Sequence, residues 1–349
     1  MKSHTKLRAG IIGIGLTFFI LLRLLSAYPD IVETYYSNGI YPVLKAFVSF
    51  PTGQFQFSIS EFLIFFLVLI CAPLYIRRIF KKKIRLYRIL LNFTTFTALI
   101  YIWFSLFWGI NYFRLPLEEK LNLMDEGLSH QAFDSVFVDL IRQTNAFNVK
   151  YGMENFTQIN QTIEAAYRKT FKDLDLPFTP ETRTVKTIAS NWLLNKTMTS
   201  GFFSPFFFEV HINSDLFVFE LPFTIAHEKA HLMGYTSEAE ANFLAFMVCI
   251  NAENALCQYS GYYAILKYFL AAIAPNKDSY DDLTKMISEG VQHDIHAVYE
   301  RWRSHQSFVA DFSARTYDLY LKANQIEEGI TNYSRVVQLV VQYKAVQKK

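Results

Sequence analysis

The sequence predicts a mostly helical α+β protein, with three N-terminal transmembrane helices followed by a helix-rich domain that contains a small β-sheet. Hydrophobic residues make up 52% of the 349 residues and charged residues only 19%, below the ~25% usual in soluble domains. Three long apolar runs lie before Asn111, and after Leu115 the composition becomes that of a globular domain. We therefore expect a membrane domain in residues 1–111 and a second domain in residues 112–349.

Each apolar run is long enough to cross the ~30 Å hydrocarbon core of a bilayer as a helix. The spans are expected at Ala9–Tyr28, Ser58–Ile76 and Leu86–Ile110. The first run is similar to a signal peptide, but Arg23 interrupts it and no small-x-small cleavage site follows. We therefore expect it to stay in the protein as an uncleaved anchor, which gives three crossings.

The distribution of basic residues predicts the orientation in the membrane. Lysines and arginines are concentrated between the second and third runs, from Arg77 to Arg88. The loop between the first and second runs has only Lys45, together with Asp30 and Glu33. Because cytoplasmic loops carry the excess of Lys and Arg, the N-terminus and the basic loop are expected in the cytoplasm. The second domain is then expected outside it.

The second domain shows helical and strand patterns in turn. Apolar residues recur at helical spacing in 129–151 and in 157–172. The segment 208–213 alternates apolar and polar residues, which is typical of a strand, and helices are expected again from Pro222 onward. The apolar run 244–274 is interrupted by polar side chains too often for a fourth span, so two buried helices are expected there.

A His-Glu-x-x-His motif at His227, Glu228 and His231 is the strongest functional signal in the chain. Pro222 supplies a helix start, and histidines at i and i+4 project from one face of a helix, one turn apart. Two histidines at this spacing bind Zn²⁺ in metalloproteases, with the glutamate as general base. The alternative is an amphipathic helix whose histidines bind no metal, and it predicts no third ligand nearby.

The residues after the motif supply candidates for the third metal ligand. Gly234 is expected to end the helix, since glycine takes the left-handed conformation common at helix ends. Ser237 and Glu240 match a capping box, in which the serine caps the next helix and the glutamate reaches back. Glu238 and Asn242 share a different face, which can point towards the metal. We therefore expect Glu238 as the third ligand, with Glu240 as the alternative.

Other candidate residues are less specific. A second electrophile is expected to stabilise the developing oxyanion, and Tyr259, Tyr317 and Tyr333 are candidates without a preference among them. His293 and His296 form an HxxH pair, but no acidic ligand pattern accompanies them. A surface helix explains this pair.

Four stretches of the chain resemble an uncharacterised family of bacterial membrane proteins, catalogued as a domain of unknown function (number 3810). They are GINYFRLP, PFTIAHEKAH with the GY and EAEANF that follow, YSGYY, and YDLYLKANQIEEGITNY. The resemblance implies a zincin-like metallopeptidase of the gluzincin type, with Zn²⁺ as cofactor. The matching site positions are His227, Glu228, His231 and Glu238.

The resemblance also concerns residues outside this ligand set. It implies that Asn324 and Tyr333 line the site. The chain departs from the family directly after the catalytic glutamate, where Lys229 replaces a small or aliphatic residue. We expect Lys229 to point to solvent, so the departure gives no indication of lost activity.

These observations together predict a membrane-anchored zinc metallopeptidase in a bacterial inner membrane, with its catalytic domain on the extracytoplasmic side. His227, His231 and Glu238 are expected to bind Zn²⁺, and Glu228 to act as general base on the attacking water. Expected partners are the lipid bilayer and peptide or protein substrates, including membrane-associated ones. The net charge of +3 gives no indication of a nucleic-acid partner. Two alternatives stay open: a non-catalytic envelope protein with a structural or vestigial zinc site, and a hydrolase of non-peptide amides.

Overall fold

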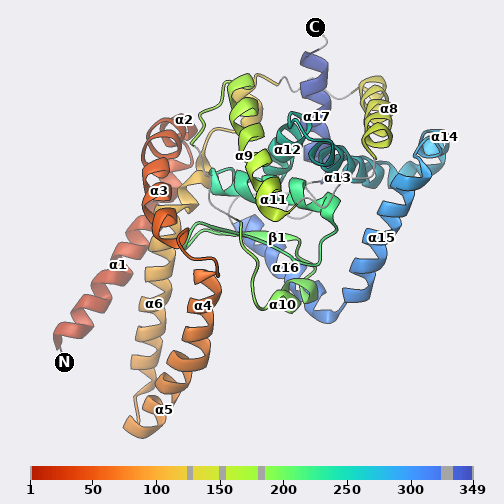
Figure 1. The fold of residues 1–349 in the computed structure, drawn as a ribbon. Coiled ribbons are helices and arrows are strands. Elements are labelled where there is room, and N and C mark those ends of the chain that lie inside the picture. Colours follow the sequence, from red (N-terminus) through yellow and green to blue (C-terminus); the bar gives the residue numbers. More distant parts are fainter. Residues whose placement is uncertain (1, 124–128, 149–154, 180–184, 324–332, 348–349) are drawn as a thin grey trace. The chain divides into compact units, whose positions relative to one another are not determined.

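The computed structural model describes residues 2–123, 129–148, 155–179, 185–323 and 333–347 (Figure 1). Within these residues the protein is mostly helical with one two-stranded sheet, as the sequence predicts. The chain forms two compact units, and each is described by itself. The first unit comprises Met1–Leu115 with Ser204–Glu209, and the second comprises Pro116–Phe203 with Val210–Lys349.

Three helices of the first unit are long and apolar enough to cross a membrane, which confirms that part of the prediction. They are α1 (Lys2–Leu25), the continuous stretch of α4 (Ile59–Phe66), η2 (Leu67–Cys71) and α5 (Ala72–Lys82), and α6 (Leu86–Phe107). The second span continues past the predicted end at Ile76 into the basic segment. Cationic side chains are favourable in the last turn of a helix, whose carbonyl groups carry partial negative charge. Helix α5 therefore extends to Lys82, and Lys83 ends it at a φ of 44°.

The segment between the first two spans is helical, although a loop is expected there. It consists of α2 (Pro29–Ile31), the π-helix η1 (Val32–Ile40) and α3 (Tyr41–Thr52). Glu33 forms a bidentate ion pair with Arg114, with both hydrogen bonds at 2.9 Å. Ser37 donates a hydrogen bond to Asn111 at 2.9 Å, within η3 (Gly109–Phe113). These partners lie far along the chain, in the GINYFRLP stretch, so local periodicity does not reveal them.

The tip of a β-hairpin, Ser204–Glu209, also belongs to the first unit. The Glu209 carboxylate accepts hydrogen bonds from the N–H groups of Ile59 at 3.0 Å and Ser60 at 2.9 Å. It also accepts one from the Ser60 hydroxyl at 2.7 Å. A carboxylate is favourable at this place because the first N–H groups of a helix have no partner within the helix. Glu209 therefore caps the start of the second span.

The second unit packs its helices around α11 (Leu221–Leu232), α12 (Glu238–Ile250) and α13 (Ala255–Ile273). Helices α12 and α13 are buried along most of their length, which confirms the two helices expected within 244–274. The Asn254 side chain starts α13 by accepting a hydrogen bond from the Cys257 N–H at 3.0 Å. The remaining helices are α7 (Leu117–Lys120), α8 (His130–Phe147), α9 (Phe156–Asp173), α10 (Asn191–Lys196), η4 (Val218–Glu220), η5 (Ala274–Tyr280), α14 (Asp281–Thr284), α15 (Glu289–His305), α16 (Phe308–Ala323) and α17 (Tyr333–Val346).

The sheet consists of β1 (Gly201–Ser204) and β2 (Glu209–Ile212). Strand β2 matches the strand expected at 208–213, whereas β1 is missed because its GFFS sequence does not alternate. Lys186 pairs with the other side of β2, through hydrogen bonds with the backbones of Val210 and Ile212 at 2.9 Å each. Among the described residues, β1 is therefore the edge strand.

Candidate metal centre

Helix α11 carries the His-Glu-x-x-His motif and is well defined at both ends. Pro222 stands in its first turn, where a helix needs no N–H from it. The Ser260 hydroxyl accepts a hydrogen bond from the Phe223 N–H at 3.0 Å. After the last turn, Gly234 has a φ of 87°, a conformation that glycine adopts readily. The expected glycine stop is thus confirmed.

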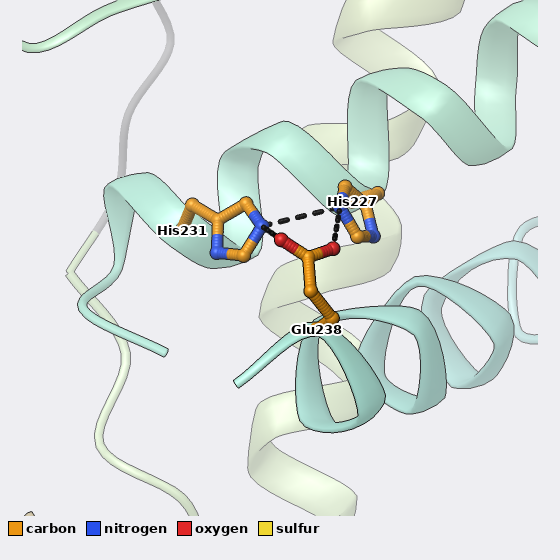
Figure 2. A group of neighbouring side chains, drawn as sticks. All are labelled: His227, His231 and Glu238. Atoms are coloured by element: carbon orange, nitrogen blue, oxygen red, sulfur yellow. Dashed lines mark hydrogen bonds and ion pairs between the residues drawn. The ribbon is translucent and has the colours of Figure 1, made fainter. Parts of the chain in front are cut away.

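Helix α12 begins shortly after this stop and carries both candidate glutamates. Ser237 is its N-cap, and the serine hydroxyl accepts a hydrogen bond from the Glu240 N–H at 3.5 Å, as expected. The Glu240 carboxylate is expected to reach back to the start of its own helix. Instead it accepts a hydrogen bond from the Leu117 N–H at 2.7 Å. Glu238, the first residue of α12, turns towards the two histidines (Figure 2).

The side chains of His227, His231 and Glu238 converge at one point (Figure 2). The two histidine Nε2 atoms lie 3.1 Å apart, and the Glu238 oxygens lie 3.2 Å and 3.5 Å from those of His227 and His231 respectively. A tetrahedral zinc ion with bonds of ~2.0–2.1 Å places neighbouring ligand atoms about 3.3–3.4 Å apart. The Nε2–Nε2 separation is close to this value, whereas the two histidines face different Glu238 oxygens. All three ligand atoms lie within 4.8 Å of one another, and the group could hold a metal ion.

The Tyr235 backbone orients the ring of His231. His231 Nδ1 lies 2.7 Å from the Tyr235 carbonyl oxygen, so Nδ1 carries a hydrogen and Nε2 faces the group. Burial lowers the pKa of His231, but the Glu238 and Glu228 carboxylates and the hydrogen bond to the Tyr235 carbonyl outweigh it and raise that pKa to about 9. Although burial acts in the opposite direction, His231 and His227 hold the pKa of Glu238 well below its usual range. Because metal ligands must be deprotonated, a metal ion is expected to compete with protons for this group.

Glu228 lies beside the metal group and is only 5% exposed. Burial raises the pKa of its carboxyl above the ordinary value, and the neighbouring His227 and His231 oppose this increase. Its carboxylate accepts a hydrogen bond from the backbone N–H of Phe203 on β1. Glu228 is therefore a buried carboxyl group next to the three convergent side chains, and the edge strand holds it.

Gly201 lets β1 approach α11 closely. A Cβ atom here would lie 2.9 Å from the His211 carbonyl oxygen, 3.0 Å from Thr224 Cγ2 and 3.1 Å from Glu228 Cγ. We expect Gly201→Ala to push β1 away from Glu228, with an overpacking penalty of about 1–3 kcal/mol. In thermal unfolding this corresponds to a fall in Tm of roughly 2–12 °C. The metal content is expected to stay unchanged, because no ligand is altered.

Gly13→Ala in α1 is the control for this prediction. A Cβ atom at Gly13 meets nothing within 4 Å, and alanine is a better helix former than glycine. We expect no loss of Tm in this variant. A Gly201→Ala protein with the wild-type Tm would contradict the close approach of β1 to α11.

Tyr317 lies at the metal group, whereas Tyr259 has a different environment. The Tyr317 hydroxyl, from α16, donates a hydrogen bond to Glu238. Tyr259 is buried, and its hydroxyl donates to an aspartate of α15 at 2.5 Å. The Tyr333 side chain and Asn324 lie outside the described residues.

Three expectations of solvent exposure have different outcomes. The side chains of His293 and His296 are exposed on α15, as expected for a surface helix. The expectation for Lys229 is wrong: it is 1% exposed, and its ammonium group lies 2.9 Å from the Glu164 carboxylate of α9. Because α9, α12 and α13 all pack against α11, a polar side chain on this helix can be buried and paired.

Fold and site together define a helical protein with three candidate membrane spans and a His-His-Glu group suited to a metal ion. The family model described as "Protein of unknown function (DUF3810)" matches residues 36–341. The chain therefore belongs to the DUF3810 family, which confirms the family resemblance of the four stretches. No curated protein and no solved structure shows a significant match to the chain.

Proposed function

We propose that the protein is a membrane-anchored zinc metallopeptidase, in which His227, His231 and Glu238 hold Zn²⁺ and Glu228 is the general base. The position of Glu228 supports this most strongly, since a buried carboxylate adjoins three convergent ligand atoms. Burial of a carboxylate is unfavourable unless other groups compensate it. A structural metal site has no use for such a group, whereas a hydrolytic site requires it.

The ligand set favours a catalytic zinc ion. Structural zinc sites have four protein ligands, whereas catalytic sites have three and leave one position for water or substrate. The group in the described part of the chain has three. Two histidines and one carboxylate also bind Fe(II) in oxygenases, but those enzymes do not need a general base beside the ligands. Glu228 therefore favours hydrolysis.

The residues of the site have separate tasks in this proposal. When bound, Zn²⁺ supplies Lewis acidity, which activates water and polarises the carbonyl of the scissile bond. Glu228 takes a proton from the attacking water and delivers it to the leaving amine. The Phe203 N–H holds the Glu228 carboxylate in place for both transfers. The Tyr317 hydroxyl, which reaches the metal group from α16, is the candidate donor to the developing oxyanion.

The edge of the sheet favours a peptide as substrate. Strand β1 is the edge strand among the described residues, and it passes beside Glu228. An extended peptide adds to such an edge through backbone hydrogen bonds, which non-peptide amides cannot form in the same way. The basic residues at the end of α5 indicate a cytoplasmic loop. The proposed substrates are therefore extracytoplasmic peptides or proteins, including membrane-associated ones.

The variant Glu228→Gln tests this function, with His227→Ala as comparison. We expect Glu228→Gln to keep its zinc, because Glu228 is not a ligand, and to lose about 10²–10⁴-fold in catalysis. His227→Ala is expected to lose both zinc and catalysis. Zinc is measured by elemental analysis of the full chain in detergent. Catalysis is measured by profiling protein N-termini in membranes that contain each form.

Wild-type membranes are expected to contain new N-termini that Glu228→Gln membranes lack. Identical sets of N-termini, in a wild type that contains zinc, would indicate a non-catalytic envelope protein with a structural metal. Iron in place of zinc would contradict the proposed hydrolysis and favour an oxygenase.

A further inference from the structure

Helix α3 of the first unit is amphipathic in the reverse sense to a helix of a soluble protein. Its buried face is mostly polar and consists of Tyr41, Lys45, Val48, Ser49 and Thr52. Its exposed positions are all apolar and consist of Val43, Ala46, Phe47, Phe50 and Pro51. The exposed fractions of the large side chains are 68% for Val43, 74% for Phe47 and 63% for Phe50. The helix therefore presents its apolar face to its surroundings.

This exposed face is continuous along the helix. Residues 43, 47 and 50 follow one another at i, i+4 and i+7, so their side chains form one stripe. Soluble monomers rarely expose contiguous apolar patches of large side chains, and such patches mark contact with a protein or a membrane. The exposed side chains of the neighbouring spans favour contact with a membrane over contact with a protein.

The spans of the same unit show the same reversal. In α6 the buried residues are Thr95 and Ser105, whereas Phe93 is 68% exposed. Exposed aromatic rings also line the segment that leads along the chain from α3 to the second span. The ring centres of Phe55 and Phe57 lie 5.3 Å apart, and those of Phe57 and Phe62 lie 6.3 Å apart. The apolar face of α3 is therefore followed along the chain by exposed rings that reach a surface which lipid covers in a membrane.

We propose that α3 lies in the bilayer interface, with Val43, Phe47 and Phe50 among the lipid acyl chains. Its 12 residues extend about 18 Å at ~1.5 Å per residue, which is too short to cross a core of ~30 Å. The helix therefore lies along the membrane, as amphipathic interfacial helices do. Its place between the first two spans puts it in the leaflet opposite the basic segment. This inference rests on the assignment of the spans to a membrane and is independent of the proposed peptidase activity.

Nitroxide labels at the stripe test the proposal. Val43, Phe47 and Phe50 are replaced by cysteine one at a time, in the full chain with Cys71→Ala. The other two cysteines are buried, and the Cys71→Ala protein alone shows whether they take the label. Each labelled protein is placed in vesicles of phosphatidylethanolamine and phosphatidylglycerol. Electron paramagnetic resonance then measures collisions of the label with oxygen, which enters lipid, and with a nickel chelate, which stays in water.

Two reference positions define the possible results. A label at Phe93 reports a lipid-facing position on α6, and a label at His293 reports an exposed position on α15. For the three stripe positions we expect an oxygen-to-nickel collision ratio several-fold above that at His293 and close to that at Phe93. A ratio equal to that at His293 would show contact with water and overturn the proposal. Few collisions with either reagent would show that protein, such as a second copy of the chain, covers the stripe, and would also overturn it.

Discussion

Replacing Glu238 by alanine is expected to release the metal ion, whereas replacing Glu240 by alanine is expected to leave it bound. The Glu238 oxygens face the Nε2 atoms of His227 and His231 at 3.2 and 3.5 Å, so this carboxylate completes the group. Loss of an outer-shell partner lowers metal affinity by ~10–100-fold. Loss of one of the three ligands is expected to lower the metal affinity by more than this. Titration of the purified protein against a chelating dye measures the affinity.

Glu240→Ala is the matched control, because it removes a carboxylate from the same turn of α12. It takes the acceptor from the Leu117 N–H, so we expect a loss of stability of about 1–3 kcal/mol. The zinc affinity is expected to stay at the wild-type value. Metal loss in Glu240→Ala alone would make Glu240 the third ligand, against the arrangement in Figure 2.

The substitution Lys229→Met is expected to destabilise the protein more than the loss of any exposed ion pair. It leaves the Glu164 carboxylate buried without the ammonium group that now lies 2.9 Å away. Breaking a buried pair from one side costs about 3–5 kcal/mol. This corresponds to a fall in Tm of roughly 6–20 °C in thermal unfolding of the full chain in detergent.

Two further variants separate the effect of burial on the Tm from the effect of charge. Lys285 is also 2.9 Å from a carboxylate, that of Asp281, but both side chains are exposed. Lys285→Met is therefore expected to leave the Tm close to the wild-type value. The double variant Lys229→Met with Glu164→Leu is expected to regain most of the lost Tm, because apolar pairs of similar volume often replace a buried ion pair without loss. A double variant as unstable as Lys229→Met would show that packing, and not the uncompensated charge, causes the loss.

The parts of the site that the sequence predicts depend on rules that act over a few residues. Helical spacing puts His227 and His231 on one face, Gly234 ends that helix, and Ser237 caps the next. These local rules leave Glu238 facing the histidines, and the structure brings the three side chains together. The three long apolar helices are predictable for a similar reason, because each consists of one continuous run.

The parts that the sequence does not predict depend on contacts between distant segments. Tyr317 donates a hydrogen bond to Glu238, which lies 79 residues away in the sequence. Lys229 pairs with Glu164, which lies 65 residues away. The Phe203 N–H reaches Glu228 only because β1 forms, and GFFS carries no strand alternation. Helix α3 is missed for another reason. An apolar and polar pattern shows that a helix has two faces, but it does not show which face meets lipid.

All three proposed metal ligands come from one stretch of chain, His227–Glu238. The entropy lost on closing a loop grows only with the logarithm of its length, so even the unfolded chain can wrap this stretch around an ion at small entropic cost. An ion that binds both the folded and the unfolded chain stabilises the fold less than its affinity suggests. The burial of α11 among α9, α12 and α13 then maintains the fold without the ion. We therefore expect a chelator to withdraw the metal reversibly and leave a folded protein that takes up the ion again.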